Sequence, residues 1–400
     1  MDLYCQLQRK IMSTIPITPS SPATTVGREM ALKFGENEGF LNALRRRVDD
    51  YFATSGKSRR DCWQMYVKTA IIAAWTLGSW ALLVFVATNW WQALLSSVSL
   101  GFAMSAVGFN IQHDGGHLAY SRHRWVNRLM AMSLDLLGGS SFFWRKTHNI
   151  VHHTFTNVTG YDGDIDLGVL GRLSPHQPRY FFHRLQHLYL WFLYGFISFK
   201  WQYYDDFSGL ITGRIGITRV ERPRGADLAI FIFGKLFFLT MALVIPLMLH
   251  PPLTVLAFYF LTFFIQGVVL STIFQLAHCV EEAEFPAAIG DPARIENEWA
   301  IHQVETTVDF AQNNPFICWY AGGLNFQIEH HLFPQICHLH YPALAPLVEQ
   351  TCREFNVKYR HHPSVLSAVR SHYSLLRHLG KAESCQTPAS ESSATPAEVA

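Results

Sequence analysis

Two pairs of long apolar segments dominate the pattern of hydrophobic and polar positions along the 400-residue chain. Each segment has about 20 residues, the length that an α-helix needs to cross a hydrocarbon core of roughly 30 Å. The turns within each pair are too short to hold a domain. The pattern therefore predicts an all-α integral membrane protein with four transmembrane helices in two hairpins, at about residues 69–88, 92–111, 228–249 and 253–277.

Charge predicts how these helices are oriented. The two hairpin turns contain no Lys or Arg, whereas the other segments contain basic clusters such as Arg45-Arg46-Arg47. The positive-inside rule therefore places both termini and residues 113–225 in the cytoplasm. Lys235, the one charge within the four segments, lies near an end from which a lysine can snorkel to the surface. The shorter apolar stretches 129–143 and 185–199 predict interfacial or buried helices of a cytoplasmic helical cap.

Polar stretches surround this apolar core and suggest a domain organisation. Residues 1–60 are expected to form an N-terminal cytoplasmic segment, and the first 30 or so, which lack periodicity and the apolar region of a signal peptide, are expected to be disordered. Residues 61–360 are expected to form one folded domain. Residues 361–400 are expected to be a cytoplasmic tail whose last 20 or so residues, rich in Ser, Ala, Pro and Glu, are disordered.

Composition narrows the functional classes. Hydrophobic residues make up 49% of the chain and charged residues 16%, against about 25% charged residues in a typical soluble domain. The net charge of +2 argues against a partner bound by bulk charge, and no nucleic acid partner is expected. The seven cysteines form no CxxC pair, which excludes a zinc ribbon, a ferredoxin cluster and a disulfide-stapled secreted domain.

Three histidine clusters stand out among the 20 histidines of the chain. On a helix, spacings of three and four residues place side chains on one face, about 5–6 Å apart. Imidazole nitrogens at these spacings suit a transition metal, with zinc, iron, copper and nickel all open. The clusters are His113-Asp-Gly-Gly-His117, His148-Asn-Ile-Val-His152-His153 and Gln327-Ile-Glu-His330-His331.

The positions of the clusters favour one shared site. An even number of predicted spans separates them, so all three reach the same side of the membrane. Eight donors exceed what one closed tetrahedral zinc ion needs and fit two ions that keep open positions. Two ions beside a bilayer suggest oxygen chemistry on a lipid, and a zinc-dependent membrane hydrolase remains an alternative.

The three clusters, in this order around two hairpins, resemble the histidine boxes of the membrane fatty acid desaturase family over about residues 60–360. The third, Gln327-Ile-Glu-His330-His331-Leu-Phe-Pro334, resembles that of front-end or linoleoyl-CoA desaturases, here without the His-Pro-Gly-Gly motif of a fused cytochrome b5 domain. The resemblance implies a non-haem site of two iron ions with O2 as co-substrate. No catalytic residues are expected beyond the ligands that it implies: His113, His117, His148, His152, His153, His278, Gln327, His330 and His331.

The resemblance also implies a reaction and partners. It suggests an oxidoreductase that introduces a C=C bond into an acyl chain, on the front-end side of an existing double bond. A hydroxylase, epoxygenase or acetylenase on the same site is the alternative. The expected substrate is a membrane lipid or acyl-CoA, and the expected electron donor is ferredoxin or cytochrome b5 with its reductase. The stand-alone chain favours a bacterial inner membrane over the endoplasmic reticulum.

The acidic run after the second cluster has two interpretations. Asp162, Asp164 and Asp166 resemble the start of an EF-hand loop, but Leu167 and Leu173 replace the glycine and glutamate that such a loop requires. We therefore expect the run to hold imidazole N–H groups beside the metal ligands.

Overall fold

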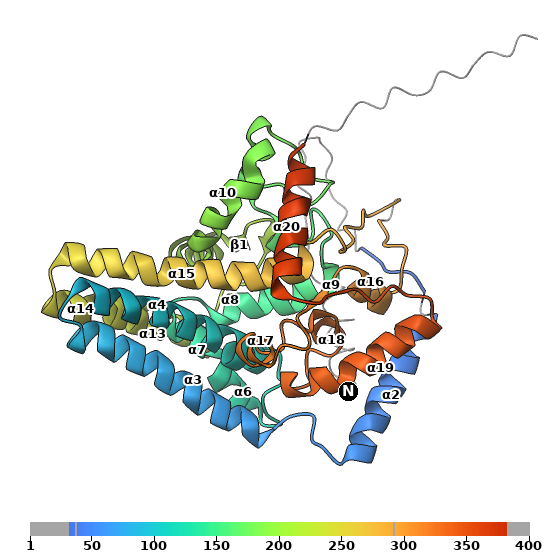
Figure 1. Cartoon of the computed structure of the whole chain (residues 1–400), viewed down its shortest axis with the longest axis horizontal. Coiled ribbons are helices and arrows are strands. Elements are labelled where there is room, and N and C mark those ends of the chain that lie inside the picture. The colour runs from blue at the N-terminus through green and yellow to red at the C-terminus, as the bar shows by residue number, and fades with distance from the viewer. Residues whose placement is uncertain (1–31, 37, 291–292, 382–400) are drawn as a thin grey trace, which may run out of the picture.

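The computed structural model describes residues 32–36, 38–290 and 293–381, and this part of the chain is mostly helical (Figure 1). The disorder expected for the first 30 and last 20 or so residues falls outside the described residues. Within them, four helices are long and apolar enough to cross a membrane, which agrees with the four predicted spans. These helices cover Trp63–Val86, Trp90–Gly116, Ala226–Leu249 and Pro252–His278.

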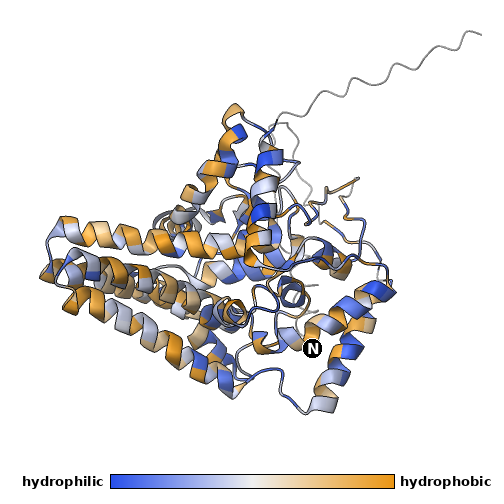
Figure 2. Cartoon of the chain, viewed as in Figure 1, coloured by the Kyte–Doolittle hydropathy of each residue, from blue (hydrophilic) through white to orange (hydrophobic). Residues whose placement is uncertain are grey.

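Three of the four long helices contain a wider π-helical turn. The first consists of α3 and η1, the second of α4, η2 and α5, the third of α13, η9 and α14, and the fourth of α15 alone. They lie side by side, and hydrophobic residues predominate along them in Figure 2. Their bounds are α3 Trp63–Ala81, η1 Leu82–Val86, α4 Trp90–Ala106, η2 Val107–Gln112, α5 His113–Gly116, α13 Ala226–Leu239, η9 Thr240–Val244, α14 Ile245–Leu249 and α15 Pro252–His278.

The second and fourth long helices pack closely because small residues lie between them. A Cβ atom added to Gly101 on α4 would lie 2.9 Å from the Thr262 carbonyl oxygen on α15. The first and second helices are joined by polar contacts, since the Trp75 indole N–H donates to Ser99 Oγ at 2.9 Å. These contacts hold the first, second and fourth long helices against one another.

The remaining helices are shorter and gather towards one end of the four long ones (Figure 1). The two stretches expected to be interfacial contain α6 to α8 and α10 to α11, and Leu188 and Phe192 on α10 are exposed. The α-helices are α2 Phe40–Ser55, α6 Arg124–Ala131, α7 Ser133–Leu136, α8 Ser141–Lys146, α9 His153–Phe155, α10 Gln186–Leu193, α11 Ile197–Lys200, α12 Asp206–Thr212, α16 Trp299–Glu305, α17 Pro315–Tyr320, α18 Gln327–Leu332, α19 Tyr341–Glu354 and α20 Val365–Gly380. The π and 3-10 turns are η3 Thr147–His152, η4 Gly163–Ile165, η5 Gly168–Leu170, η6 Phe181–Leu185, η7 Tyr194–Phe196, η8 Trp201–Asp205 and η10 His338–His340.

Two short strand pairs complete the described fold, and one of them involves residues beyond 360. β1 (Arg214–Ile215) pairs antiparallel with β2 (Thr218–Arg219). β3 (Asp309–Phe310) pairs parallel with β4 (His361–His362). After β4, α20 lies beside α10 and its His372 Nε2 is 2.7 Å from the Tyr194 hydroxyl. The packed structure therefore continues to the end of α20.

Lys235 does not reach the surface, so the prediction that it snorkels is wrong. Its side chain is buried, and its ammonium group donates to Asp206 Oδ2 at 2.6 Å and to the Gly138 carbonyl at 2.5 Å. A third bond goes to the Gln202 carbonyl at 3.3 Å. Because α12 supplies a buried carboxylate and η8 a carbonyl oxygen beside α13, the lysine forms an internal ion pair that joins these elements.

Candidate metal centre

Eight histidine side chains from four parts of the chain come together at one end of the long helices. The first cluster lies at α5, where the second long helix ends, and His278 is the last residue of α15. The second cluster occupies η3 and the start of α9, and the third occupies α18. All eight side chains are buried, with exposed fractions of 7% or less. They are His113, His117, His148, His152, His153, His278, His330 and His331.

The imidazoles fall into two neighbouring groups. In the first group, one ring nitrogen from each of four histidines lies within 4.8 Å of the others: His113, His117, His148 and His330. The second group meets the same criterion and contains His152, His278 and His331. His153 lies between the groups, with its Nε2 3.0 Å from His330 Nε2 and its ring stacked on that of His331.

The nitrogens that face the interior of these groups fit a metal ion. Buried polar atoms almost always have a hydrogen-bond partner, so an unpaired one calls for an explanation. Five Nε2 atoms of the cluster are buried without a hydrogen-bond partner among the described residues: those of His113, His117, His148, His152 and His331. A bound transition metal would satisfy their lone pairs.

Electrostatics keep most of these imidazoles in the form that can bind a metal ion. Burial lowers the pKa of five of the imidazoles, so they are neutral near pH 7 and offer a lone pair: His117, His148, His153, His330 and His331. Burial acts on His152 in the same direction, but the carboxylates of Asp162 and Asp164 outweigh it and raise the pKa of His152. Among these six imidazoles, His152 therefore holds its proton most strongly.

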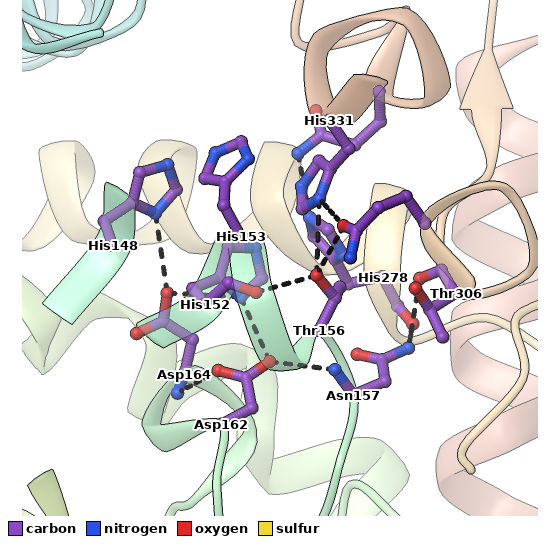
Figure 3. Close-up of polar contacts among 12 residues, drawn as sticks. His148, His152, His153, Thr156, Asn157, Asp162, Asp164, His278, Thr306 and His331 are labelled. Atoms are coloured by element: carbon purple, nitrogen blue, oxygen red, sulfur yellow. Dashed lines mark hydrogen bonds and ion pairs between the residues drawn. The ribbon is translucent and has the colours of Figure 1, made fainter. Parts of the chain in front are cut away.

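The acidic run Asp162, Asp164 and Asp166 was expected to hold imidazole N–H groups, and the first two residues lie where they can do so (Figure 3). Asp162 Oδ2 lies 3.0 Å from His152 Nδ1 and also accepts the Asn157 backbone N–H at 2.9 Å. Asp164 Oδ2 lies 3.6 Å from His148 Nδ1. These contacts leave Nε2 of each imidazole to point towards its group. Asp166 instead accepts the Gly168 N–H, at 2.8 Å.

Gln303 and Thr156 hold the second group, and the sequence pattern did not reveal either residue. Gln303 Oε1 lies 2.7 Å from His331 Nδ1 and accepts the Thr156 hydroxyl at 3.0 Å. The Thr156 hydroxyl also lies 3.3 Å from His331 Nδ1. Gln303 comes from α16, far from the clusters in sequence, so no local spacing could have identified it.

Asn157 joins three segments around the second group. As with Gln303 and Thr156, no sequence motif predicts this role. Its side-chain amide nitrogen lies 2.9 Å from the His278 carbonyl and 3.2 Å from each of the Glu284 and Thr306 carbonyls. The residue adopts the left-handed conformation, with a φ of 60°, which asparagine tolerates better than most residues do. The end of α15 is thereby connected to the second cluster.

Local backbone features explain why the first two clusters converge. The first cluster directly follows the π-helical turn η2, and most of the second lies in the π-helical turn η3; such turns are frequent at functional sites. A Cβ atom added to Gly115 would lie 2.6 Å from Met130 Cβ, and one added to Gly116 would lie 2.3 Å from the Trp144 ring. The two glycines of the first cluster thus permit close packing, and Trp144 stacks on His148 with 4.5 Å between ring centroids.

Gln327, the one member of the third cluster's donor set that is not a histidine, lies beside the second group. Its amide nitrogen is 2.8 Å from His278 Nε2, and its Oε1 is buried without a partner among the described residues. An amide oxygen is a weaker donor to a transition metal than an imidazole. The second group therefore has three imidazoles and an amide where the first has four imidazoles.

Buried carboxyl groups fix the helix that carries the third cluster. Asp309 Oδ1 accepts the Ile328 N–H at 2.9 Å, and Asp309 Oδ2 accepts the Tyr359 hydroxyl at 2.6 Å. The same hydroxyl lies 3.1 Å from Glu329 Oε1. Burial, together with the neighbouring Asp309, raises the pKa of Glu329.

Comparison with known proteins gives a consistent result. The family model described as fatty acid desaturase matches residues 88–363. An sn-1 linoleoyl-lipid 6-desaturase of Arthrospira platensis is 42% identical over 345 residues, covering 86% of this chain and 93% of that protein. The protein with the same description from Synechocystis sp. is 41% identical over 352 residues, covering 88% and 98%. An acyl-lipid (8-3)-desaturase of Physcomitrium patens is 39% identical over 352 residues, covering 87% and 73%.

Proposed function

Because this chain belongs to the fatty acid desaturase family, we propose that it is a front-end desaturase acting on lipid-bound acyl chains. The family assignment makes it a membrane oxidoreductase that introduces a C=C bond into an acyl chain with O2, as the sequence predicted. The observation that carries the finer proposal is the match to two linoleoyl-lipid 6-desaturases over nearly their whole lengths. We infer that the new bond lies at carbon 6 of a linoleoyl chain held in a lipid.

We propose that the site holds two iron ions, one in each histidine group. The unpaired Nε2 atoms in both groups support this proposal. Bound iron supplies the capacity to react with O2 that side chains lack. The proposed ligands of one ion are His113, His117, His148 and His330, and those of the other are His152, His278, His331 and Gln327, with His153 beside both.

The residues around the groups would keep the ligands in place and keep water out. Asp162, Gln303 and Tyr341 each contact the outer nitrogen of one imidazole, which fixes the ring orientation. All of the histidines are buried, so a reactive oxidant formed there would meet an acyl chain before it met bulk water. No proton-transferring side chain is needed beyond the ligands in this proposal.

We propose that both termini and the histidine groups lie in the cytoplasm, with the short helices forming a cap. The lack of Lys and Arg in the turn residues 89–91 and 250–252 supports this orientation, because basic residues concentrate on the cytoplasmic side. We place the protein in a bacterial inner membrane. We propose that electrons come from ferredoxin, or from cytochrome b5 with its reductase.

Expression in a host that provides ferredoxin and linoleoyl lipids tests the function. Mass spectrometry of the lipids should reveal a new double bond at carbon 6, absent from cells that express the His153→Ala variant. Membrane insertion of the variant, checked by fractionation, should be unchanged because insertion depends on the apolar helices. A hydroxylated product, or a double bond on the methyl side of the existing ones, would contradict the proposal.

A further inference from the structure

A pair of cysteines lies at the start of α3, apart from the proposed iron ligands. Cys62 is the residue before α3, and Cys337 follows the third histidine cluster. Both pack in one cluster with Met65 and Tyr120, and both are free thiols. The Cys337 N–H donates to the Arg59 carbonyl at 2.9 Å, so the two segments lie side by side.

The surroundings of the two thiols differ in a way that suits a reactive pair. Cys62 is partly exposed and its Sγ lies 3.3 Å from His340 Nε2, whereas Cys337 is fully buried. Cys62 also precedes the first N–H groups of a long helix, which favour a negative charge. The neighbouring Cys337, together with His340, lowers the pKa of Cys62 to about 5. The nearby Cys62 and burial raise the pKa of Cys337.

We propose that Cys62 and Cys337 form a redox modification site at which a hydroperoxide converts the two thiols to a disulfide. The Cys62 sulfur would attack the outer peroxide oxygen, breaking the O–O bond and releasing an alcohol or water. The resulting sulfenic acid would then be attacked by the Cys337 sulfur, which breaks the S–O bond and releases water. Two thiols and one hydroperoxide thus give one disulfide, one alcohol or water molecule, and one further water molecule.

The site is placed to meet hydroperoxides from the membrane as well as from water. Trp63, the next residue after Cys62, is 69% exposed at the end of the first long helix, where tryptophan marks the boundary between lipid and water. A disulfide here would join the start of that helix to the segment after the third cluster. His338, next to Cys337, lies 2.9 Å from Asp114 Oδ2, beside the first cluster.

Peptide mapping of the iron-loaded full-length protein in nanodiscs tests the proposal. One sample receives hydrogen peroxide and another contains lipid hydroperoxide, which separates the two sources. Digestion without reductant should yield a Cys62–Cys337 linked peptide pair, lost on treatment with dithiothreitol, in at least one sample. In the Cys337→Ser variant, Cys62 should instead be trapped as sulfenic acid by dimedone. Cys318→Ser is the matched control and should leave the linked pair intact.

Alkylation rates provide a second measurement that needs no variant. Cys318 is another half-buried thiol, and its sulfur contacts the Gln312 carbonyl and the Asn325 amide. At about pH 5.5, iodoacetamide should modify Cys62 roughly tenfold faster than Cys318, because the lowered pKa of Cys62 keeps much of this residue as the reactive thiolate. Equal rates, or oxidation of Cys62 without a link to Cys337 in both hydroperoxide samples, would overturn the proposal.

Discussion

Replacing Asp162 should weaken metal binding in the second histidine group. The Asp162 side chain is buried and has three contacts: His152 Nδ1 at 3.0 Å, the Asn157 N–H at 2.9 Å and the Asp164 N–H at 3.0 Å. Alanine removes all three, so the His152 ring loses its orienting partner. Loss of such an outer contact typically costs 10–100-fold in metal affinity, or about 1.4–2.7 kcal/mol.

Asp162→Asn should weaken metal binding less than Asp162→Ala does, because part of the hydrogen bonding is kept. One oxygen in the place of Oδ2 can still serve His152 and the Asn157 N–H, but the new amide nitrogen then faces the Asp164 N–H. One buried donor is left without its acceptor, at a cost of about 1–3 kcal/mol to folding. Asp162→Asn should therefore lower the melting temperature while weakening metal binding less than Asp162→Ala does.

A chelator competition with Fe(II) under anaerobic conditions measures the affinity, and thermal unfolding in detergent measures the stability. Asp166→Ala is the matched control, because Asp166 lies on the same loop but accepts the Gly168 N–H. The control should retain the wild-type affinity. If Asp162→Ala binds Fe(II) within about twofold of the wild type, the orienting role of this carboxylate is refuted.

Three further predictions follow from the described contacts. Lys235→Met should destabilise the fold by about 3–5 kcal/mol because Asp206 stays buried without its partner, and adding Asp206→Asn should restore part of the loss in a chemical denaturation experiment. Gln303→Leu should lower iron content by removing the acceptor for His331 Nδ1, measured by elemental analysis of the purified protein. Acidification from about pH 8 to about pH 6 should release the metal beside His152 first, since its raised pKa makes it the first ligand to protonate; simultaneous loss of both metals would contradict this order.

The sequence revealed the ligand candidates because their spacing is local. His113 and His117, or His148 and His152, are separated by one helical turn, whereas His278 was expected only from the resemblance to the desaturase family. The four long helices could also be predicted from the sequence, since the length of an apolar segment alone indicates a membrane-spanning helix.

The residues that orient the ligands could not be found in this way. Gln303 reaches His331 across 28 positions, and Asn157 reaches the Thr306 carbonyl across 149. Such pairs depend on how helices pack, which hydrophobic periodicity does not specify. The error at Lys235 has the same origin, because its partner Asp206 lies on a short helix whose position beside α13 is set by tertiary packing.

The lengths of the long helices bear on how a substrate gains access. The two that end in histidines of the proposed metal site, Trp90–Gly116 and Pro252–His278, have 27 residues each, and the other two have 24. At 1.5 Å per residue, 27 residues span about 40 Å, roughly 10 Å more than a hydrocarbon core. The histidines would then lie outside the hydrocarbon core, and an acyl chain would have to leave its leaflet to reach them. The distance from the lipid headgroup to the histidines would determine which carbon atoms of the acyl chain react.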